Sequence, residues 1–173
     1  DGLLGEAFDL FASDPQALEI VTDALLELGQ GEAVELVDYP ETEAEYRSLA
    51  RRKTGALFKA AAALGAVAAG RDDGTVEAMG EYAERVGIAF QIRDDVLDAT
   101  AEAERLGKPT GRDASMERPS LLRVTELGPA AADDRARAEV DAALTALDRV
   151  EDLDAEARAY LTEVAQFVVD RER

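Results

Sequence analysis

The sequence predicts an all-α protein built as a single bundle of helices. Apolar residues recur every three or four positions along most of the chain, and no segment alternates apolar and polar residues as a strand would. Proline, glycine and capping residues separate these periodic segments. At 173 residues the chain has the length of one domain, and no linker divides it. We therefore expect residues 1–173 to belong to one helical domain.

The helix boundaries follow from local signals. Ser13-Asp14-Pro15 ends a first helix, 1–12, and begins a second with proline at its first position. Thr42 and Glu45 can form a capping box for a third helix that reaches about residue 70. Further helices are expected at 76–100, from Pro119 over a short stretch, at 129–150 and at 154–170.

Glu32 falls on the apolar stripe of the second helix, where an unpaired carboxylate is costly. The stripe is formed by Leu18, Val21, Leu25 and Leu36. One interpretation is a shift of register at Gly29 or Gly31, or an ion pair between Glu32 and a neighbouring arginine. The other is that Glu32, with Glu35 nearby, faces a polar cavity inside the bundle.

Lys53 lies in the middle of the apolar stripe of the third helix. That stripe is formed by Tyr46, Leu49, Ala56, Leu57, Ala60, Leu64 and Val67. Burying an ammonium group without a partner is costly, so we expect an anion beside it. The anion is either Glu32, in a buried salt bridge, or a bound diphosphate. Because lysine occurs at only three positions in the chain, we favour the bound ligand.

The segment from Phe90 to Asp98 gathers acids on one side of a helix. At about 100° per residue, Gln91, Asp94 and Asp98 fall within an arc of roughly 60°, and Asp95 lies just outside it. Such a cluster repels itself unless cations bridge it. One or two carboxylates completed by a substrate phosphate are a ligand set that Mg²⁺ uses. In so acidic a chain, the alternative is a solvated acidic face.

Composition narrows the class of protein. The net charge of -19 argues against nucleic acid or an anionic membrane as a partner, and an acid excess with few lysines favours a salt-adapted, halophilic protein. The absence of Cys and His excludes disulfides, a thiol nucleophile and imidazole catalysis. The longest apolar run, 60–69, is about half a membrane span, so we expect no transmembrane segment and a cytoplasmic protein.

Downstream of the acidic helix, residues 106–113 form a loop punctuated by Gly and Pro. Such a loop can place Lys108 and backbone N–H groups over an anion, or it can be a plain connection.

Together these stretches resemble the C-terminal half of an all-trans polyprenyl diphosphate synthase, the family of farnesyl and geranylgeranyl diphosphate synthases. The segments that carry the resemblance are, in order, Asp1 to Leu4 with Ala7-Phe8, Gly31 to Leu36, Lys53 to Phe58, Phe90 to Asp98, Gly107-Lys108 with Gly111 and Asp113, and Phe167 to Arg173. Arg118-Pro119-Ser120 is a mild departure, since the family often has Lys-x-Thr there.

The resemblance implies an isoprenoid synthase-type bundle, with this chain as the C-terminal part of the domain. It also implies a homodimer and a transferase of isoprenoid biosynthesis that uses Mg²⁺. That enzyme would condense an allylic diphosphate with isopentenyl diphosphate after ionising the allylic C–O bond. The implied metal-binding residues are Asp94, Asp98 and, through water, Asp95; the implied catalytic residues are Lys53, Asp94 and Lys108. The implied substrate-binding residues are Glu32, Lys53, Thr54, Phe90, Gln91, Lys108, Arg171 and Arg173.

The family has an earlier aspartate-rich motif in its N-terminal half, whereas D-D-x-x-D occurs once in this sequence. We therefore expect N-terminal helices to be missing and this chain to be inactive alone. Two alternatives remain: a non-catalytic subunit or fragment that binds diphosphate, and a helical interaction module whose acids are only a solvated face.

Overall fold

The computed structural model describes residues 2–37, 39–106, 119–125 and 127–171, and every regular element in these ranges is helical. The elements are α1 (Gly2–Phe11), α2 (Pro15–Val37), α3 (Glu43–Ala50), the π-helical segment η1 (Arg51–Gly55), α4 (Ala56–Ala68), α5 (Asp73–Leu106), α6 (Leu121–Val124), α7 (Pro129–Leu147) and α8 (Ala155–Asp170). The predicted all-α class is confirmed.

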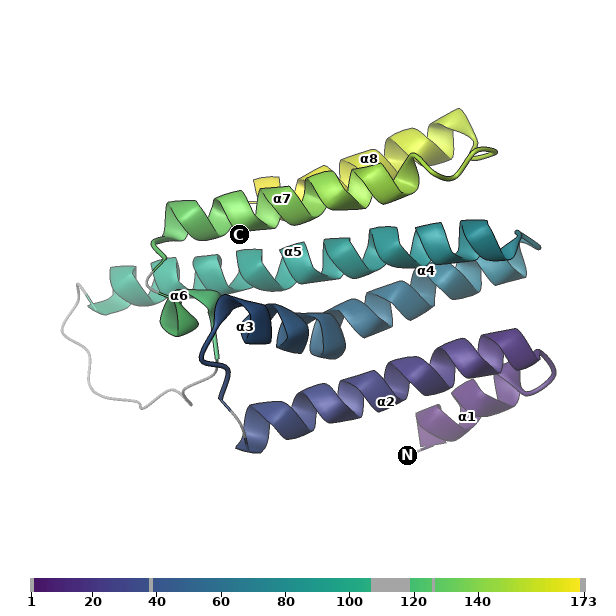
Figure 1. The fold of residues 1–173 in the computed structure, drawn as a ribbon, viewed down its shortest axis with the longest axis horizontal. Coiled ribbons are helices and arrows are strands. Elements are labelled where there is room, and N and C mark those ends of the chain that lie inside the picture. The colour runs from purple at the N-terminus through teal and green to yellow at the C-terminus, as the bar shows by residue number, and fades with distance from the viewer. Residues whose placement is uncertain (1, 38, 107–118, 126, 172–173) are drawn as a thin grey trace.

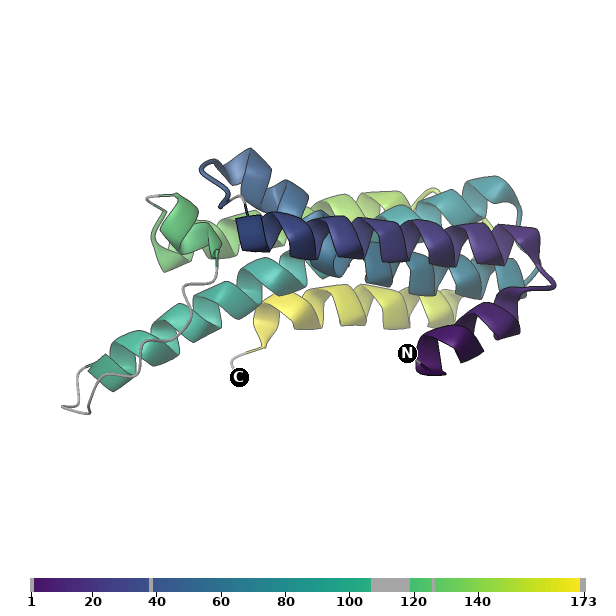
Figure 2. The same ribbon diagram turned by 90° about the horizontal axis from the view of Figure 1, so that it is seen from below.

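The long helix α5 is the centre of the bundle. It packs against α4 and η1 on one side and against α7 and α8 on the other, with α3 and α6 near its second half (Figure 1). α2 covers α4 and η1 from outside, and α1 packs on α2. The C-terminal turns of α5 extend beyond the neighbouring helices (Figure 2).

The sequence predicted the helix starts well. The Asp14 carboxylate accepts from the backbone N–H groups of Gln16 and Ala17, at 3.0 and 3.1 Å, at the start of α2. The predicted capping box between Thr42 and Glu45 is present at α3. Each cap satisfies N–H groups that have no partner within the helix. α5 (Asp73–Leu106) is longer than the predicted 76–100 at both ends.

Two parts of the predicted apolar stripes are wrong. Leu36 is 83% exposed, and Leu57 is also exposed. The buried positions of α2 are instead Ala17, Ala24 and Gly31, small residues at a seven-residue spacing that let α2 lie close to its neighbours.

η1 is a turn of π-helix within an otherwise continuous helix from α3 to α4. The Ala56 N–H donates to the carbonyl of Arg51, five residues back, rather than four. The wide turn accommodates one extra residue and so changes which later positions face α5. After this turn Leu57 is exposed, whereas Ala56, Ala60, Ala63 and Ala66 are buried. Within the described ranges, no helix is long and apolar enough to cross a membrane.

Candidate functional site

The predicted site residues gather around the second half of α5. Phe90, Gln91, Asp94 and Asp98 lie on α5, Lys53 and Thr54 lie on η1, and Arg171 directly follows α8. η1 and α8 both pack on α5, so the fold brings these three segments together. The Lys53-Thr54 pair sits within the π turn, and such turns occur frequently at functional sites.

Close packing at η1 depends on two glycines. A Cβ on Gly87 would lie 3.0 Å from the Gly55 Cα and 3.1 Å from the Phe58 ring, so α5 meets η1 at backbone distance. On the other side of η1, a Cβ on Gly31 would lie 3.1 Å from the backbone nitrogen of Lys53. η1 is therefore held between α2 and α5 with no space for a side chain at either contact.

Asp95 points into the protein and not along the acidic face. Its side chain is buried, and its Oδ2 accepts from the Tyr46 hydroxyl at 2.6 Å and from the Leu121 backbone N–H at 3.0 Å. Its Oδ1 accepts from Gln91 Nε2 at 3.2 Å. Burial raises the pKa of Asp95 above its ordinary value, although these three donors act in the opposite direction.

Thr54 joins the same set of hydrogen bonds. Its hydroxyl donates to Gln91 Oε1 at 2.9 Å, so the Gln91 amide connects η1 with Asp95 on α5. Thr54 and Gln91, which are both predicted to line the substrate site, are thus in direct contact.

Asp94 is half exposed and pairs with Arg171. The distance from Arg171 Nη2 to Asp94 Oδ1 is 2.9 Å, and the guanidinium lies over the Phe90 ring at 4.1 Å from its centroid. The Arg171 carbonyl accepts from Arg93, which also pairs with Asp133 at 2.7 Å. Arg171 Nε is buried and has no hydrogen-bond partner among the described residues. The end of α8 is thus fixed against the acidic helix.

Asp98 lies one turn after Asp94 on α5 and is exposed. Within the described residues, no three His, Cys, Asp or Glu side chains are gathered so that they alone could hold a metal ion. Asp94 and Asp98 do fit a Mg²⁺ ion that takes its remaining ligands from water and a bound phosphate, because Mg²⁺ often uses only one or two carboxylates. Asp95 does not offer a free carboxylate to such an ion.

Lys53 is half buried and ion-paired with α2. Its ammonium contacts the Glu35 carboxylate closely and lies 3.5 Å from Glu32 Oε1. Glu32 itself is exposed and lies beside Lys53. The salt bridge to Lys53, which the sequence left as the alternative to a bound diphosphate, is present, with Glu35 as the nearer partner. Lys108 and Arg173, also predicted as site residues, lie outside the described residues.

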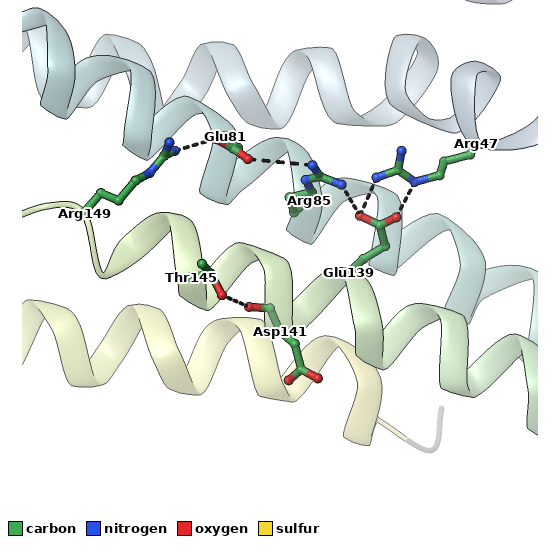
Figure 3. A network of polar contacts seen from close by, with 7 residues as sticks. All are labelled: Arg47, Glu81, Arg85, Glu139, Asp141, Thr145 and Arg149. Atoms are coloured by element: carbon green, nitrogen blue, oxygen red, sulfur yellow. Dashed lines mark hydrogen bonds and ion pairs between the residues drawn. The ribbon is translucent and has the colours of Figure 1, made fainter. Parts of the chain in front are cut away.

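Sequence reasoning missed the role of Tyr46, which it assigned only to an apolar stripe, and the contact of Arg93 with the end of α8. It also missed a buried carboxylate, Glu139 on α7, which pairs with Arg47 and Arg85 (Figure 3). The signal for such pairs is weak, because the partners lie 92 and 54 residues apart in sequence.

A surface cavity of about 370 Å³ lies away from these residues. Its lining comes from the turn before α5, the start of α5 and the turn after α7, namely Arg71, Asp72, Gly74, Thr75, Glu77, Ala78, Arg149, Glu151 and Asp152. Thr75 and Asp94 are separated by about 28 Å along α5 at 1.5 Å per residue. The cavity is therefore not part of the aspartate site.

Solved structures place the fold among the helical isoprenoid synthases. A polyprenyl synthase from Caulobacter crescentus, solved with calcium and isoprenyl diphosphate, superposes with a TM-score of 0.81 at 28% identity, over 99% of this chain and 64% of that one. A geranylgeranyl pyrophosphate synthetase from Geoglobus acetivorans gives a TM-score of 0.80 at 25% identity, with 99% and 64% covered.

Residues 1–159 match the polyprenyl synthetase family, and the chain belongs to it. A geranylfarnesyl diphosphate synthase from Aeropyrum pernix is 31% identical, over 90% of this chain and 60% of the relative. A short chain isoprenyl diphosphate synthase from Methanocaldococcus jannaschii is 43% identical over 57% of this chain and 31% of the relative. The chain thus spans less than two thirds of the length of these relatives.

Proposed function

We propose that this chain is the diphosphate-binding part of a chain-elongating prenyltransferase, which condenses an allylic diphosphate with isopentenyl diphosphate. The main support is that Asp94 lies on α5, while the segments that carry Lys53 and precede Arg171, η1 and α8, both pack on α5. Family membership and the prenyl diphosphate synthases among the relatives support the reaction class. The homodimer and the cytoplasmic location predicted from the sequence stay predictions.

In this proposal Asp94 and Asp98 hold Mg²⁺ together with the diphosphate. Bound Mg²⁺ would neutralise charge on the diphosphate and so make it a better leaving group. Asp95 would act indirectly, because its two oxygens already accept three hydrogen bonds from the protein.

Lys53 and Arg171 are the described cations proposed to bind the diphosphate. Each is paired with a carboxylate, Lys53 with Glu35 and Arg171 with Asp94. A diphosphate would therefore compete with these internal carboxylates for the two cations. The buried Nε of Arg171, which has no partner among the described residues, gives the diphosphate an additional donor once the guanidinium turns toward it.

Calorimetry with an inert thio analogue of geranyl diphosphate tests this function, with MgCl₂ or with EDTA, in high KCl. We expect binding that requires Mg²⁺ and weakens at least about tenfold in Asp94→Ala and Lys53→Ala, since each removes a charge-assisted contact. Asp141→Ala and Lys59→Ala are matched controls, because both residues are exposed and lie on other helices. These controls should bind like the unmodified chain.

Because the chain spans only part of its relatives, the same titration is run on a polypeptide extended upstream. Mg²⁺-independent binding, equal losses in the controls, or no binding by either polypeptide would contradict the proposal. Binding by the extended polypeptide without product formation from allylic and isopentenyl diphosphates would instead favour a non-catalytic diphosphate-binding subunit.

A further inference from the structure

Tyr46 is a buried residue whose hydroxyl reaches the acidic helix from outside it. It lies on α3, is only 2% exposed, and donates to Asp95 Oδ2 at 2.6 Å across 49 residues of sequence. The hydroxyl is the donor in this contact, because an ionised carboxylate can only accept. Tyr46 therefore supplies one of the hydrogen bonds that hold the Asp95 side chain in place.

Asp95 also accepts hydrogen bonds from α6 and from its own helix, α5. The oxygen that accepts from Tyr46 also accepts from the Leu121 N–H, at the first residue of α6. The other oxygen holds the amide nitrogen of Gln91. With both oxygens engaged from three directions, the carboxylate cannot rotate without breaking a buried hydrogen bond.

The Gln91 amide carries the constraint on to η1. Because Asp95 accepts from Nε2, the amide turns its oxygen to the Thr54 hydroxyl, which donates to it at 2.9 Å. A rotated Asp95 would release the amide and leave the Thr54 hydroxyl without its acceptor. The orientation of Thr54, within the wide turn that also carries Lys53, thus depends on a hydroxyl on a different helix.

We propose that Tyr46 is a positioning residue of the diphosphate site: through Asp95 and Gln91, its hydroxyl fixes the Thr54 side chain beside the bound diphosphate. This inference rests on the proposed function. It differs from a purely structural role, in which Tyr46 would only fill the core between α3 and α5.

Tyr46→Phe tests the proposal, because it removes one oxygen and keeps the ring in the core. Tyr82→Phe is the matched control: Tyr82 is 3% exposed, lies on α5, and donates to the Leu161 carbonyl at 2.7 Å. Each variant loses one buried hydrogen bond, so we expect similar, small decreases of the denaturation midpoint. Of these two tyrosines, Tyr46 is the one connected to Thr54, through Asp95 and Gln91.

We expect Tyr46→Phe to weaken Mg²⁺-dependent binding of the thio analogue roughly three- to tenfold, the range of one hydrogen bond, and Tyr82→Phe to leave it unchanged. Thr54→Val should weaken binding similarly, and adding it to Tyr46→Phe should cause little further loss, because both changes disrupt one network. Equal affinity in Tyr46→Phe and Tyr82→Phe, or additive losses in the double variant, would overturn the proposal.

NMR of the ligand-free protein separates this proposal from the proposed function. The side-chain amide signals of Gln91 should shift in Tyr46→Phe and not in Tyr82→Phe. If they shift as expected but neither this chain nor the upstream-extended polypeptide binds the analogue, the network exists and the diphosphate function is wrong. If they do not shift, the connection from Tyr46 to Gln91 is wrong whatever the binding results.

Discussion

Glu139 is a carboxylate that α7 buries among arginines from other helices. It is 8% exposed and accepts from Arg47 on α3 and Arg85 on α5, the latter at 3.1 Å. Arg85 also pairs with Glu81, which contacts Arg149 in the turn after α7, so the charges connect α3, α5 and α7 (Figure 3). Burial alone would raise the pKa of Glu139, but the two guanidiniums outweigh it and lower the pKa.

Replacing Glu139 with Gln should reduce the free energy of unfolding by about 1–2 kcal/mol at pH 7, because two charge-assisted hydrogen bonds become weaker. Urea denaturation followed by circular dichroism measures the change. Asp141→Asn is the control, since Asp141 lies on the same helix and its side chain points away from the network (Figure 3). A Glu139→Gln variant as stable as this control would contradict the interpretation.

The contribution of Glu139 to the free energy of unfolding should also depend on pH, and the direction follows from its lowered pKa. Since the folded pKa of Glu139 is lower than its ordinary 4.5, the unfolded chain binds the proton more readily. The stabilisation by Glu139 is therefore complete above pH 4.5 and is lost as the pH falls through the lower, folded pKa. We expect the difference in unfolding free energy between the unmodified chain and Glu139→Gln to shrink below pH 4.5, and a difference that grows there would be the opposite result.

The sequence could single out some candidate site residues and not others. Helical spacing alone is enough to select Asp94 and Lys53 as candidates, because it places them on a face shared with acidic or apolar neighbours. The partners of Asp95 could not be found in this way, since Tyr46 and Leu121 lie 49 and 26 residues away and neither forms a local pattern with it. Whether the predicted residues bind substrate or metal stays a prediction.

At the level of elements, α5 and η1 pack closely because each has a glycine at the point of contact, Gly87 on α5 and Gly55 on η1. Gly87→Ala would place a methyl group 3.0 Å from the Gly55 Cα, and backbone cannot move aside as a flexible side chain can. We expect a loss of about 1–3 kcal/mol in the free energy of unfolding, typical of overpacking. Thermal denaturation would report it.

Gly29→Ala is the matched control, because Gly29 is also inside a helix but a Cβ there meets nothing within 4 Å. We expect that change to stabilise the protein by about 0.5–1 kcal/mol through the higher helix propensity of alanine. If both substitutions stabilise, the close approach of α5 and η1 is not present in solution.

The helices themselves were largely predictable, because their starts carry chemical signals such as the Asp14 cap and the Thr42–Glu45 box. The π turn was not. No residue preference distinguishes a bond to the fifth preceding residue from one to the fourth, so the sequence predicted a regular helix through residues 51–55.

For the whole molecule, charge is the dominant property. With a net charge of -19, self-repulsion opposes the folded state, and added salt should screen it. We expect the thermal midpoint to rise as KCl increases from dilute buffer to about 1 M, where the Debye length has fallen to about 3 Å. Differential scanning calorimetry measures the change.

Sucrose at matched osmolality controls for solvent exclusion, because it carries no charge. KCl should raise the midpoint more than sucrose does. A midpoint that is highest in dilute buffer would remove the support for a salt-adapted protein.

The wide turn at η1 also affects which changes in chain length the fold can absorb. Losing one residue from a regular helix rotates all later side chains by about 100° and turns a buried face outward. Between Arg51 and Gly55 the chain already contains one residue more than a regular turn needs, so the loss of one can tighten the turn and leave α4 facing α5 as before. Lys53 and Thr54 would then point elsewhere on an unchanged scaffold. This short segment is where a deletion could alter the binding chemistry of the bundle while its architecture stays the same.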